Sequence, residues 1–337
     1  METSGNSRRQ FIRTATIAGI GLGFGGTLSR VFAQTPVSVG RRIGIIGLDT
    51  SHSVEFTKMF NSPDADPALK GFRVTAVYPQ GSRDIKSSLD MVPGYLKEIK
   101  EMGIEIVDSI SALLEKTDMI LLESNDGRVH LEQALPVLKA GKPMFIDKPV
   151  AASLADTGVI FKTARQYKVP VFSSSALRYM DSVQQVLKGK VGKVTGADVY
   201  TPAFLEKTHP DLFWYAIHGV EVLFTLMGTG CRKVTRISGP DIDVVTGVWE
   251  DGRIGVLRAI KKGPYGFGGH VFGEKAIAPV SDFDSYKPLV YQIAAFFDTG
   301  IVPVKPEETL EIIAFMEAAD ASKRKNGATI KMGNTIF

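Results

Sequence analysis

A lysine between an aspartate and a proline is the first place in the sequence where chemistry is expected. Residues 130–150 read HLEQALPVLKAGKPMFIDKPV, in which a helix-period segment and a short apolar strand lead to Asp147-Lys148-Pro149. The carboxyl end of a strand is where an open α/β sheet binds its ligands. Pro149 cannot continue a strand ladder, so the chain must turn and present Lys148, whose ammonium group can meet a bound oxygen atom. The alternative is a solvated loop lysine, which an isolated tripeptide of this kind favours.

Around this motif, short apolar runs alternate with helical segments from Arg42 to about Pro170. The spacing predicts strands over 43–48, 73–78, 104–107, 119–122, 143–146 and 170–173, and helices over 51–60, 94–102, 109–116, 129–140 and 153–167. Continuously apolar strands that alternate with helices indicate a parallel sheet covered on both faces, with right-handed crossovers. The motif therefore belongs to a Rossmann-like, doubly wound sheet.

The pattern changes after Ser175. A helix over 181–187 and a glycine turn lead to an alternating strand over 193–200, and an apolar helix follows over 215–227. Further strands are predicted over 233–238, 243–249 and 255–260, and the last two are joined at Asp251-Gly252, a hairpin signal. Helices over 286–297 and 306–323 close the chain. We expect an α+β domain on an open, largely antiparallel sheet with helices on one face.

The first 33 residues are interpreted as an export signal. Ser7-Arg8-Arg9-Gln10-Phe11 is a twin-arginine pattern, followed by a glycine-rich apolar run to Leu28 and a cleavage signal ending at Ala33. The run is shorter than the roughly 20 apolar residues of a membrane span, so we expect no stable membrane insertion; the alternative is a retained N-terminal anchor. We expect the twin-arginine machinery to export the chain to the periplasm, a route often taken by proteins that fold around a cofactor.

The remaining chain is long enough for two hydrophobic cores, which we assign to residues 34–174 and 175–337. The formal net charge of +4 falls close to zero without the signal, so no basic stripe argues for nucleic acid. Cys231 is the only cysteine of the sequence, which excludes an internal disulfide. Stability must therefore come from packing.

The first predicted strand leads into residues 47–52, the position of a dinucleotide-binding turn. Of the fingerprint G-x-G-x-x-G only Gly47 is kept, since Asp49 takes the second glycine position and His52 the third. A carboxylate about 4 Å from a phosphate costs roughly 4 kcal/mol at an effective dielectric near 20. A standard pyrophosphate pose therefore requires that Asp49 cap the helix, point away or bind a cation. Capping is expected, because Asp49, Thr50 and Ser51 are all suitable N-cap residues.

The helix that begins there still offers free N–H groups to an anion. Asp49 and His52 could also form one corner of a metal site, but a capped helix with a packed imidazole is the more ordinary interpretation of this spacing, and no metal site is predicted.

Taken together, these residues resemble the Gfo/Idh/MocA family of NAD(P)-dependent oxidoreductases. The family's Glu-Lys-Pro motif is similar to Asp147-Lys148-Pro149, and its arginine after the sixth strand resembles Arg178. Its second-domain helix with an inward histidine is similar to the segment around His218. The resemblance covers essentially all of the chain after the signal, and it implies a Rossmann-like domain followed by an α+β domain for substrate binding and subunit contact.

The resemblance also implies a division of labour between two residues. Lys148 would lie against a substrate hydroxyl and lower its pKa, and neutral His218 would accept the proton while hydride passes to a nicotinamide. A core histidine is the alternative for His218. Trp214 stands where most relatives have an aspartate, which leaves slow, rearranged or absent activity open. The residues expected to contact substrate are Arg178, Tyr179, Trp214 and Tyr215, with core packing as the alternative for the aromatic side chains.

The expected cofactor is NADP or NAD. The second strand is followed by Gly81-Ser82-Arg83 and not by an acidic residue, which suits a 2′-phosphate and favours NADP; the alternative is a surface turn. The residues expected at the cofactor are Gly47, Leu48, Asp49, Thr50, Ser51, His52, Ser82, Arg83, Asn125, Asp147 and Lys148.

Two functions remain open at this stage. The first is an exported oxidoreductase that acts on a sugar, a polyol or a related hydroxylated small molecule, assembled as a homo-oligomer through the C-terminal sheet. The second is a catalytically silent, carbohydrate-like binding protein on the same fold. Lys148, Arg178 and His218 favour the enzyme, while Asp49, His52 and Trp214 favour the binding protein.

Overall fold

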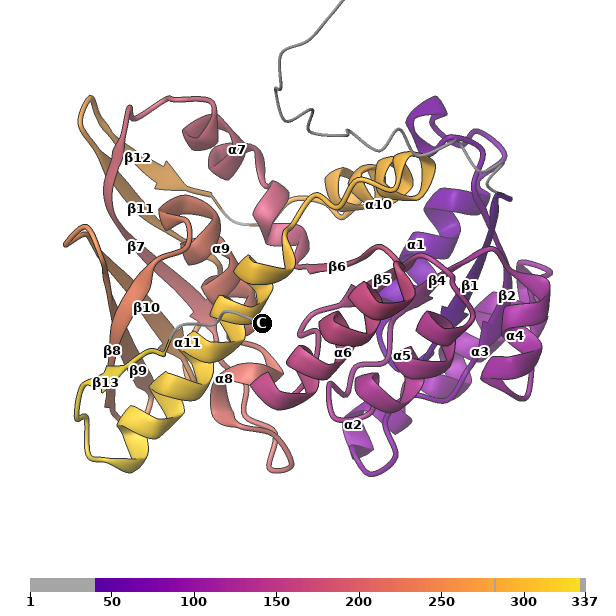
Figure 1. Ribbon diagram of the computed structural model, residues 1–337, viewed down its shortest axis with the longest axis horizontal. Coiled ribbons are helices and arrows are strands. Elements are labelled where there is room, and N and C mark those ends of the chain that lie inside the picture. Colours follow the sequence, from indigo (N-terminus) through magenta and orange to yellow (C-terminus); the bar gives the residue numbers. More distant parts are fainter. Residues whose placement is uncertain (1–39, 282, 334–337) are drawn as a thin grey trace, which may run out of the picture. The chain divides into compact units, whose positions relative to one another are not determined.

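The computed structural model describes residues 40–281 and 283–333, so the predicted twin-arginine signal lies outside the described residues. The described residues form one compact unit that contains two sheets (Figure 1). Within the described ranges, no helix has both the length and the apolar composition needed to cross a bilayer.

The first sheet is parallel and has the strand order β3-β2-β1-β4-β5-β6. Its strands are β1 (Arg42–Ile46), β2 (Arg73–Tyr78), β3 (Glu105–Ile106), β4 (Met119–Leu122), β5 (Met144–Asp147) and β6 (Val171–Ser174). Strands β4, β5 and β6 are buried along their whole length, as expected where helices cover both faces of a parallel sheet. Because the strand order reverses between β1 and β4, the carboxyl ends of β1, β4 and β5 meet at a topological switch point.

Helices cover both faces of this sheet. On one face, α1 (Ser51–Asn61) and α3 (Val92–Glu101) share a core with α10 (Lys287–Thr299), which comes from the far end of the chain. On the other face lie α4 (Ile110–Lys116), α5 (His130–Lys139) and α6 (Leu154–Tyr167). A short helix, α2 (Lys86–Leu89), and the 3₁₀ turn η1 (Pro67–Leu69) lie in the connections around β2. Through α10, the C-terminal part of the chain helps to cover the N-terminal sheet.

The second sheet has the order β12-β11-β7-β10-β9-β8-β13 and is antiparallel except for the β7–β10 pair. Its strands are β7 (Val194–Pro202), β8 (Cys231–Ser238), β9 (Ile242–Trp249), β10 (Ile254–Ile260), β11 (Gly268–Gly273), β12 (Ile277–Val280) and β13 (Ile330–Lys331). Helices α9 (Ile217–Met227) and α11 (Pro306–Arg324) pack on it. The elements η2 (Ala176–Tyr179), α7 (Asp181–Leu187) and α8 (Asp211–Trp214) complete the domain.

These two sheets confirm the predicted fold class. The Asp251-Gly252 hairpin is present, with Gly252 at φ 85° between β9 and β10. The sequence analysis missed β11, β12 and β13, because glycines interrupt β11 and a proline interrupts β12, and neither residue type favours a strand. Most predicted helices agree with the structure to within one or two residues.

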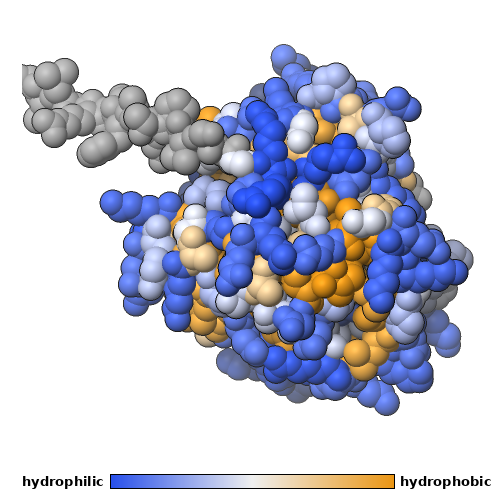
Figure 2. All heavy atoms as spheres, turned by 90° about the vertical axis from the view of Figure 1, so that its right-hand side faces the viewer, coloured by the Kyte–Doolittle hydropathy of each residue, from blue (hydrophilic) through white to orange (hydrophobic). Residues whose placement is uncertain are grey.

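Large parts of the surface are polar. Figure 2 views the N-terminal sheet side and shows charged and polar residues over most of that face, with an apolar area exposed among them. On the C-terminal sheet, Ile237, Ile254 and Ile277 are exposed by more than half. These side chains belong to strands whose other face is buried against helices.

Buried charge in the C-terminal domain is concentrated at one arginine. Arg236 on β8 is fully buried, and its guanidinium group bonds to Asp243, to Asp320 and, at 2.8 Å, to Asp211. These three carboxylates come from β9, α11 and α8, so one side chain connects a strand pair to two helices. Removing it would leave Asp320 without this ion pair, while Asp243 would keep only Lys261 and Asp211 only Lys323.

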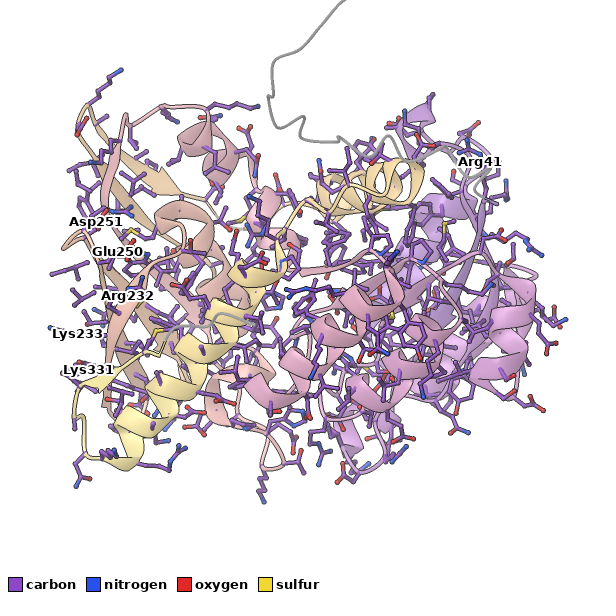
Figure 3. All side chains as sticks on the ribbon, in the orientation of Figure 1. Arg41, Arg232, Lys233, Glu250, Asp251 and Lys331 are labelled. Carbon is purple, nitrogen blue, oxygen red and sulfur yellow. The ribbon has the colours of Figure 1, made fainter. Side chains whose placement is uncertain are left out.

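We therefore expect Arg236→Ala to lower the free energy of unfolding by about 3–5 kcal/mol, the usual loss when one partner of a buried ion pair is removed. Urea denaturation followed by circular dichroism measures this. The matched control is Arg232→Ala on the same strand, because Arg232 is exposed and pairs with Glu250 near the outer end of the sheet (Figure 3). Its unfolding midpoint should stay close to that of the parent. Equal midpoints for the two variants would contradict a central role for Arg236.

Candidate active site

A cavity of about 330 Å³ lies where the carboxyl ends of the first sheet face the C-terminal domain. Its volume is near the lower end of the roughly 300–1,000 Å³ of small-molecule sites. A larger hollow of about 650 Å³ runs beside α11, but no histidine is among its lining residues. The residues of the first cavity that the sequence had singled out are Thr50, Ser51, His52, Asn125, Lys148, Trp214, Tyr215 and His218.

Lys148 follows the last residue of β5 and forms part of the cavity wall. Its Nζ lies 3.2 Å from Asp147 Oδ2, its side chain is only 8% exposed, and its bond to Pro149 is cis. Burial acts to lower the pKa of Lys148, but the Asp147 carboxylate outweighs burial and the net effect is a raised pKa. Lys148 is therefore a buried, permanently charged ammonium group at the end of a strand.

The same aspartate oxygen holds a histidine from α1. His52 Nδ1 lies 2.9 Å from Asp147 Oδ2, and its ring stacks on Phe56 and meets the edge of Tyr286. Burial acts to raise the pKa of Asp147, but His52 and Lys148 outweigh burial and lower it. The anionic carboxylate thus fixes the position of two nitrogen groups from different elements.

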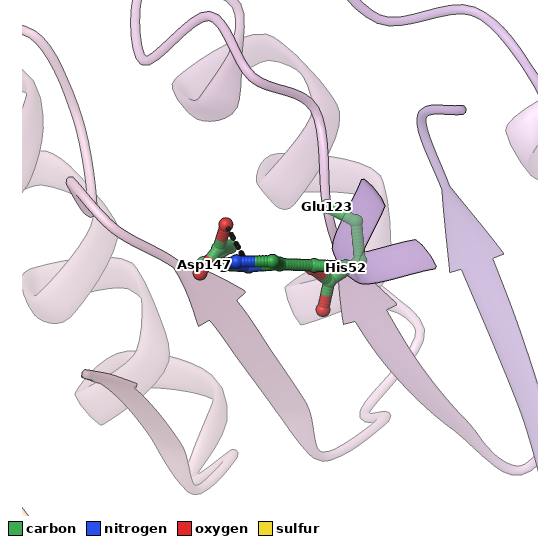
Figure 4. A group of neighbouring side chains, drawn as sticks. All are labelled: His52, Glu123 and Asp147. Atoms are coloured by element: carbon green, nitrogen blue, oxygen red, sulfur yellow. Dashed lines mark hydrogen bonds and ion pairs between the residues drawn. The ribbon is translucent and has the colours of Figure 1, made fainter. Parts of the chain in front are cut away.

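A second buried carboxyl group lies beside this arrangement. Glu123 directly follows β4 and is fully buried close to His52 and Asp147 (Figure 4). Burial and then the charge of Asp147 raise the pKa of Glu123 well above its ordinary value. The sequence analysis missed this residue, although an acidic side chain immediately after a buried apolar strand was a usable signal.

His218 reaches the cavity from α9 in the other domain. Its Nδ1 lies 2.7 Å from the Ser175 hydroxyl oxygen, which also accepts a hydrogen bond from the Leu177 N–H. Burial and then the Lys148 ammonium group lower the pKa of His218 well below its ordinary value. The imidazole is therefore neutral at physiological pH and faces the same cavity as Lys148. Ser175 was also missed, since only the fold brings it to the histidine.

The turn between β1 and α1 has Asp49 where the fingerprint has its second glycine, and this residue was expected to cap the helix. Thr50, and not Asp49, caps α1, through its hydroxyl group. Asp49 is buried and accepts hydrogen bonds from the Ser82 N–H at 2.8 Å and the Asn125 N–H at 3.1 Å. Its carboxylate thus connects the ends of β1, β2 and β4 and lies outside the cavity lining. Gly47 keeps a φ of 93°, and a Cβ there would come within 2.6 Å of the Ser124 backbone.

Other predicted site residues lie away from the cavity. Arg178 pairs with Glu221 at 3.1 Å and Glu308 at 2.5 Å, and burial raises the pKa of Tyr179 to about 12. Neither Arg178 nor Tyr179, both expected to contact substrate, lines this cavity: Arg178 joins η2 to helices α9 and α11, and Tyr179 packs against the core that contains α10. Arg83 is exposed and pairs with Glu132. The remaining predicted residues outside the lining are Gly47, Leu48, Asp49, Ser82, Arg83 and Asp147.

The parallel sheet and the cavity at its switch point define a Rossmann-type nucleotide-binding fold with a second domain over the strand ends. Residues 41–175 match the model of the GFO_IDH_MocA oxidoreductase family, described as having an NAD-binding Rossmann fold. The match confirms, for residues 41–175, the predicted resemblance to the Gfo/Idh/MocA family. No curated protein matches the sequence.

Solved structures resemble the chain over most of its length. Scyllo-inositol dehydrogenase from Lactobacillus casei, with NAD(H) and scyllo-inositol bound, is 17% identical and has a TM-score of 0.68 over 86% of this chain and 98% of that chain. Myo-inositol 2-dehydrogenase from Lactobacillus plantarum is 14% identical, with a TM-score of 0.71 over 87% of this chain and 99% of that chain. At such identities the likeness is one of fold.

The family model implies a bound dinucleotide, and the residues at the N-terminal end of α1 fit its phosphate groups. The obstacle raised by Asp49 is removed, because its carboxylate is turned into the protein and held by backbone N–H groups. Thr50 and Ser51 open the helix and line the cavity, where helix N–H groups favour a phosphate. A phosphate can thus be bound at a capped helix N-terminus, although the second and third glycines of the fingerprint are missing.

The proximity of Lys148 and His218 leads to a titration that can be measured directly. Lys148→Met removes the ammonium group that lowers the pKa of His218, so this pKa should rise toward the ordinary value of about 6.5. NMR titration of the imidazole signals measures it, and the chain has only five histidines. His218→Gln identifies the signal.

Lys142→Met is the matched control, because Lys142 bonds to the Thr117 carbonyl oxygen at the opposite end of the same strand. It should leave the His218 titration unchanged. An unchanged His218 pKa in Lys148→Met would show that the Lys148 ammonium group does not lower the pKa of His218.

Proposed function

We propose that the protein is an exported NAD(P)-dependent oxidoreductase that acts on a sugar, a polyol or a related hydroxylated small molecule. The observation that carries this proposal is the convergence of a cationic lysine and a neutral histidine, from separate domains, on one cavity. A hydroxyl group that is to lose a proton and a hydride needs both an electrostatic partner and a base. The two inositol dehydrogenases of similar fold make cyclic polyols the first substrates to test.

The chain's own residues would divide the work as follows. Lys148 binds the substrate oxygen and lowers the pKa of the hydroxyl group, because its own charge is secured by Asp147. His218 accepts the proton, and Ser175 holds the ring through Nδ1. Tyr215 and Trp214 line the same cavity and offer aromatic faces to a sugar ring.

The cofactor would be held by Thr50 and Ser51 at the start of α1 and by Asn125 after β4, all of which line the cavity. When bound, the nicotinamide takes up or releases the hydride. NADP is favoured over NAD by Arg83 alone, whose exposed ion pair with Glu132 would have to yield to a 2′-phosphate.

A second function is favoured by a specific observation. The cavity is about 330 Å³, and His52, which stands where the fingerprint has its third glycine, already fills part of the strand-end region with its ring. A space of this size suits one sugar-sized molecule better than a dinucleotide with a substrate. The second candidate is therefore a small-molecule binding protein without nicotinamide chemistry.

One set of measurements on the purified full chain separates the two functions. The oxidoreductase predicts NAD(P)(H) released on denaturation or a rise in melting temperature with either dinucleotide, and turnover of a polyol from a panel of inositols and sugar alcohols. Lys148→Ala should lower this turnover by about 10²–10⁴-fold, the usual size of a lost acid–base group. Lys142→Ala, just before the amino end of β5, serves as the control.

A melting shift with a polyol but with neither dinucleotide, and no turnover, would support the binding protein instead. Wild-type turnover in Lys148→Ala would refute the assigned role of the lysine.

We also propose that the twin-arginine segment directs export to the periplasm and that the open C-terminal sheet forms a homo-oligomer. Replacing Arg8→Lys together with Arg9→Lys should keep the precursor in the cytoplasm, measured by cell fractionation and immunoblotting, because the pattern requires the arginine pair. Arg13→Lys is the matched control and should be exported normally. Export of the double variant would contradict the signal.

A further inference from the structure

Three side chains capable of binding a metal ion converge beneath the cavity. His52 comes from the start of α1, Glu123 from the end of β4 and Asp147 from the end of β5, and their ligand atoms all lie within 4.8 Å of one another (Figure 4). All three side chains are buried. The topological switch point brings them together, since they are 24 or more positions apart in the sequence.

The oxygen atoms of this cluster are not satisfied by the protein. Among the described residues, neither Glu123 Oε1 nor Glu123 Oε2 has a hydrogen-bond partner, and the same is true of Asp147 Oδ1. A buried polar atom without a partner costs about 1–3 kcal/mol, and a native structure rarely keeps three of them together. These atoms therefore indicate a ligand that supplies the missing contacts.

The donor types indicate that this ligand is a cation: an imidazole nitrogen and two carboxyl groups, of which Glu123 would release its proton when the cation binds. Lys148 Nζ lies 3.2 Å from Asp147 Oδ2, and its positive charge offsets the negative charge of that carboxylate. Within the described residues, no salt bridge reaches Glu123. A buried carboxylate is tolerated when it is paired or when it coordinates a metal ion.

We propose that His52, Glu123 and Asp147 bind a divalent first-row transition metal ion, Mn²⁺ or Zn²⁺. The imidazole favours such an ion over Mg²⁺ or Ca²⁺, and two carboxylates suit Mn²⁺ as well as Zn²⁺. Ligand atoms at 2.0–2.2 Å from one ion are at most about 4.4 Å apart, so small side-chain movements close the set. The hydrogen bond between His52 Nδ1 and Asp147 Oδ2 would give way to the ion.

Three protein ligands leave coordination positions open, which is the arrangement of catalytic and not of structural metal sites. His52 and Lys148 both line the cavity, so an open position there can meet a substrate oxygen. The ion would polarise a hydroxyl or carbonyl oxygen beside Lys148. This inference does not depend on a dinucleotide, and it would hold for either function proposed above.

The test measures metal binding and not turnover. The purified full chain is stripped with a chelator, titrated with Mn²⁺ and with Zn²⁺ by isothermal calorimetry, and analysed for bound metal by mass spectrometry. We expect one ion per chain, and a weakening of at least tenfold in Glu123→Gln, which keeps the shape of the side chain and removes its charge. The control is Glu132→Gln, because Glu132 is exposed and pairs with Arg83; it should bind as the parent does.

Circular dichroism establishes that Glu123→Gln is folded, and His52→Gln provides a second variant with the same expected loss. Failure of the parent chain to bind either ion at one equivalent would overturn the proposal, as would unchanged binding in a folded Glu123→Gln. Metal binding without any dinucleotide effect would leave the proposal standing while refuting the oxidoreductase.

Discussion

The buried carboxylate of Asp147 is the interaction on which the rest of the site depends. It terminates β5, the strand next to the edge strand β6 of the parallel sheet, and one of its oxygens holds both Lys148 and His52. An ammonium group this deeply buried would lose its proton or unfold the strand end without a nearby anion. The family's motif has a glutamate at this position, and the aspartate here is shorter by one methylene.

The charge of Lys148 then determines the state of the second domain's histidine. His218 packs against Tyr215 and Phe267 and is kept neutral by burial and by the ammonium group opposite. The Asp147 carboxylate therefore keeps Lys148 charged, and the charge of Lys148 helps to keep His218 in the other domain unprotonated. The packing of α10 against the first sheet holds the two domains in the arrangement that this coupling requires.

Much of this could be predicted from the sequence, and the failures have physical causes. The strands of the first sheet are continuous apolar runs, so their positions and the place of Lys148 followed from periodicity. The pairing of Arg178 with Glu221 and Glu308 could not be foreseen, since nothing in a linear pattern says which acidic residues a buried arginine will meet. Glu123 was overlooked for a related reason: it carries no motif, and its meaning comes from the strand order that sets it beside Asp147.

The turn after β1 shows how a lost motif can be replaced by a different solution. In the glycine fingerprint, the second glycine lets the backbone approach a pyrophosphate. Here Asp49 binds the N–H groups of Ser82 and Asn125, so the strand ends are tied together by a side chain. Because the carboxylate is turned into the protein, the N-terminal end of α1 at Thr50 and Ser51 remains as the anion site. The cavity is therefore present without the second and third glycines, and the carboxyl groups of Glu123 and Asp147 are buried beside His52 in its wall, where they provide ligands for a cation.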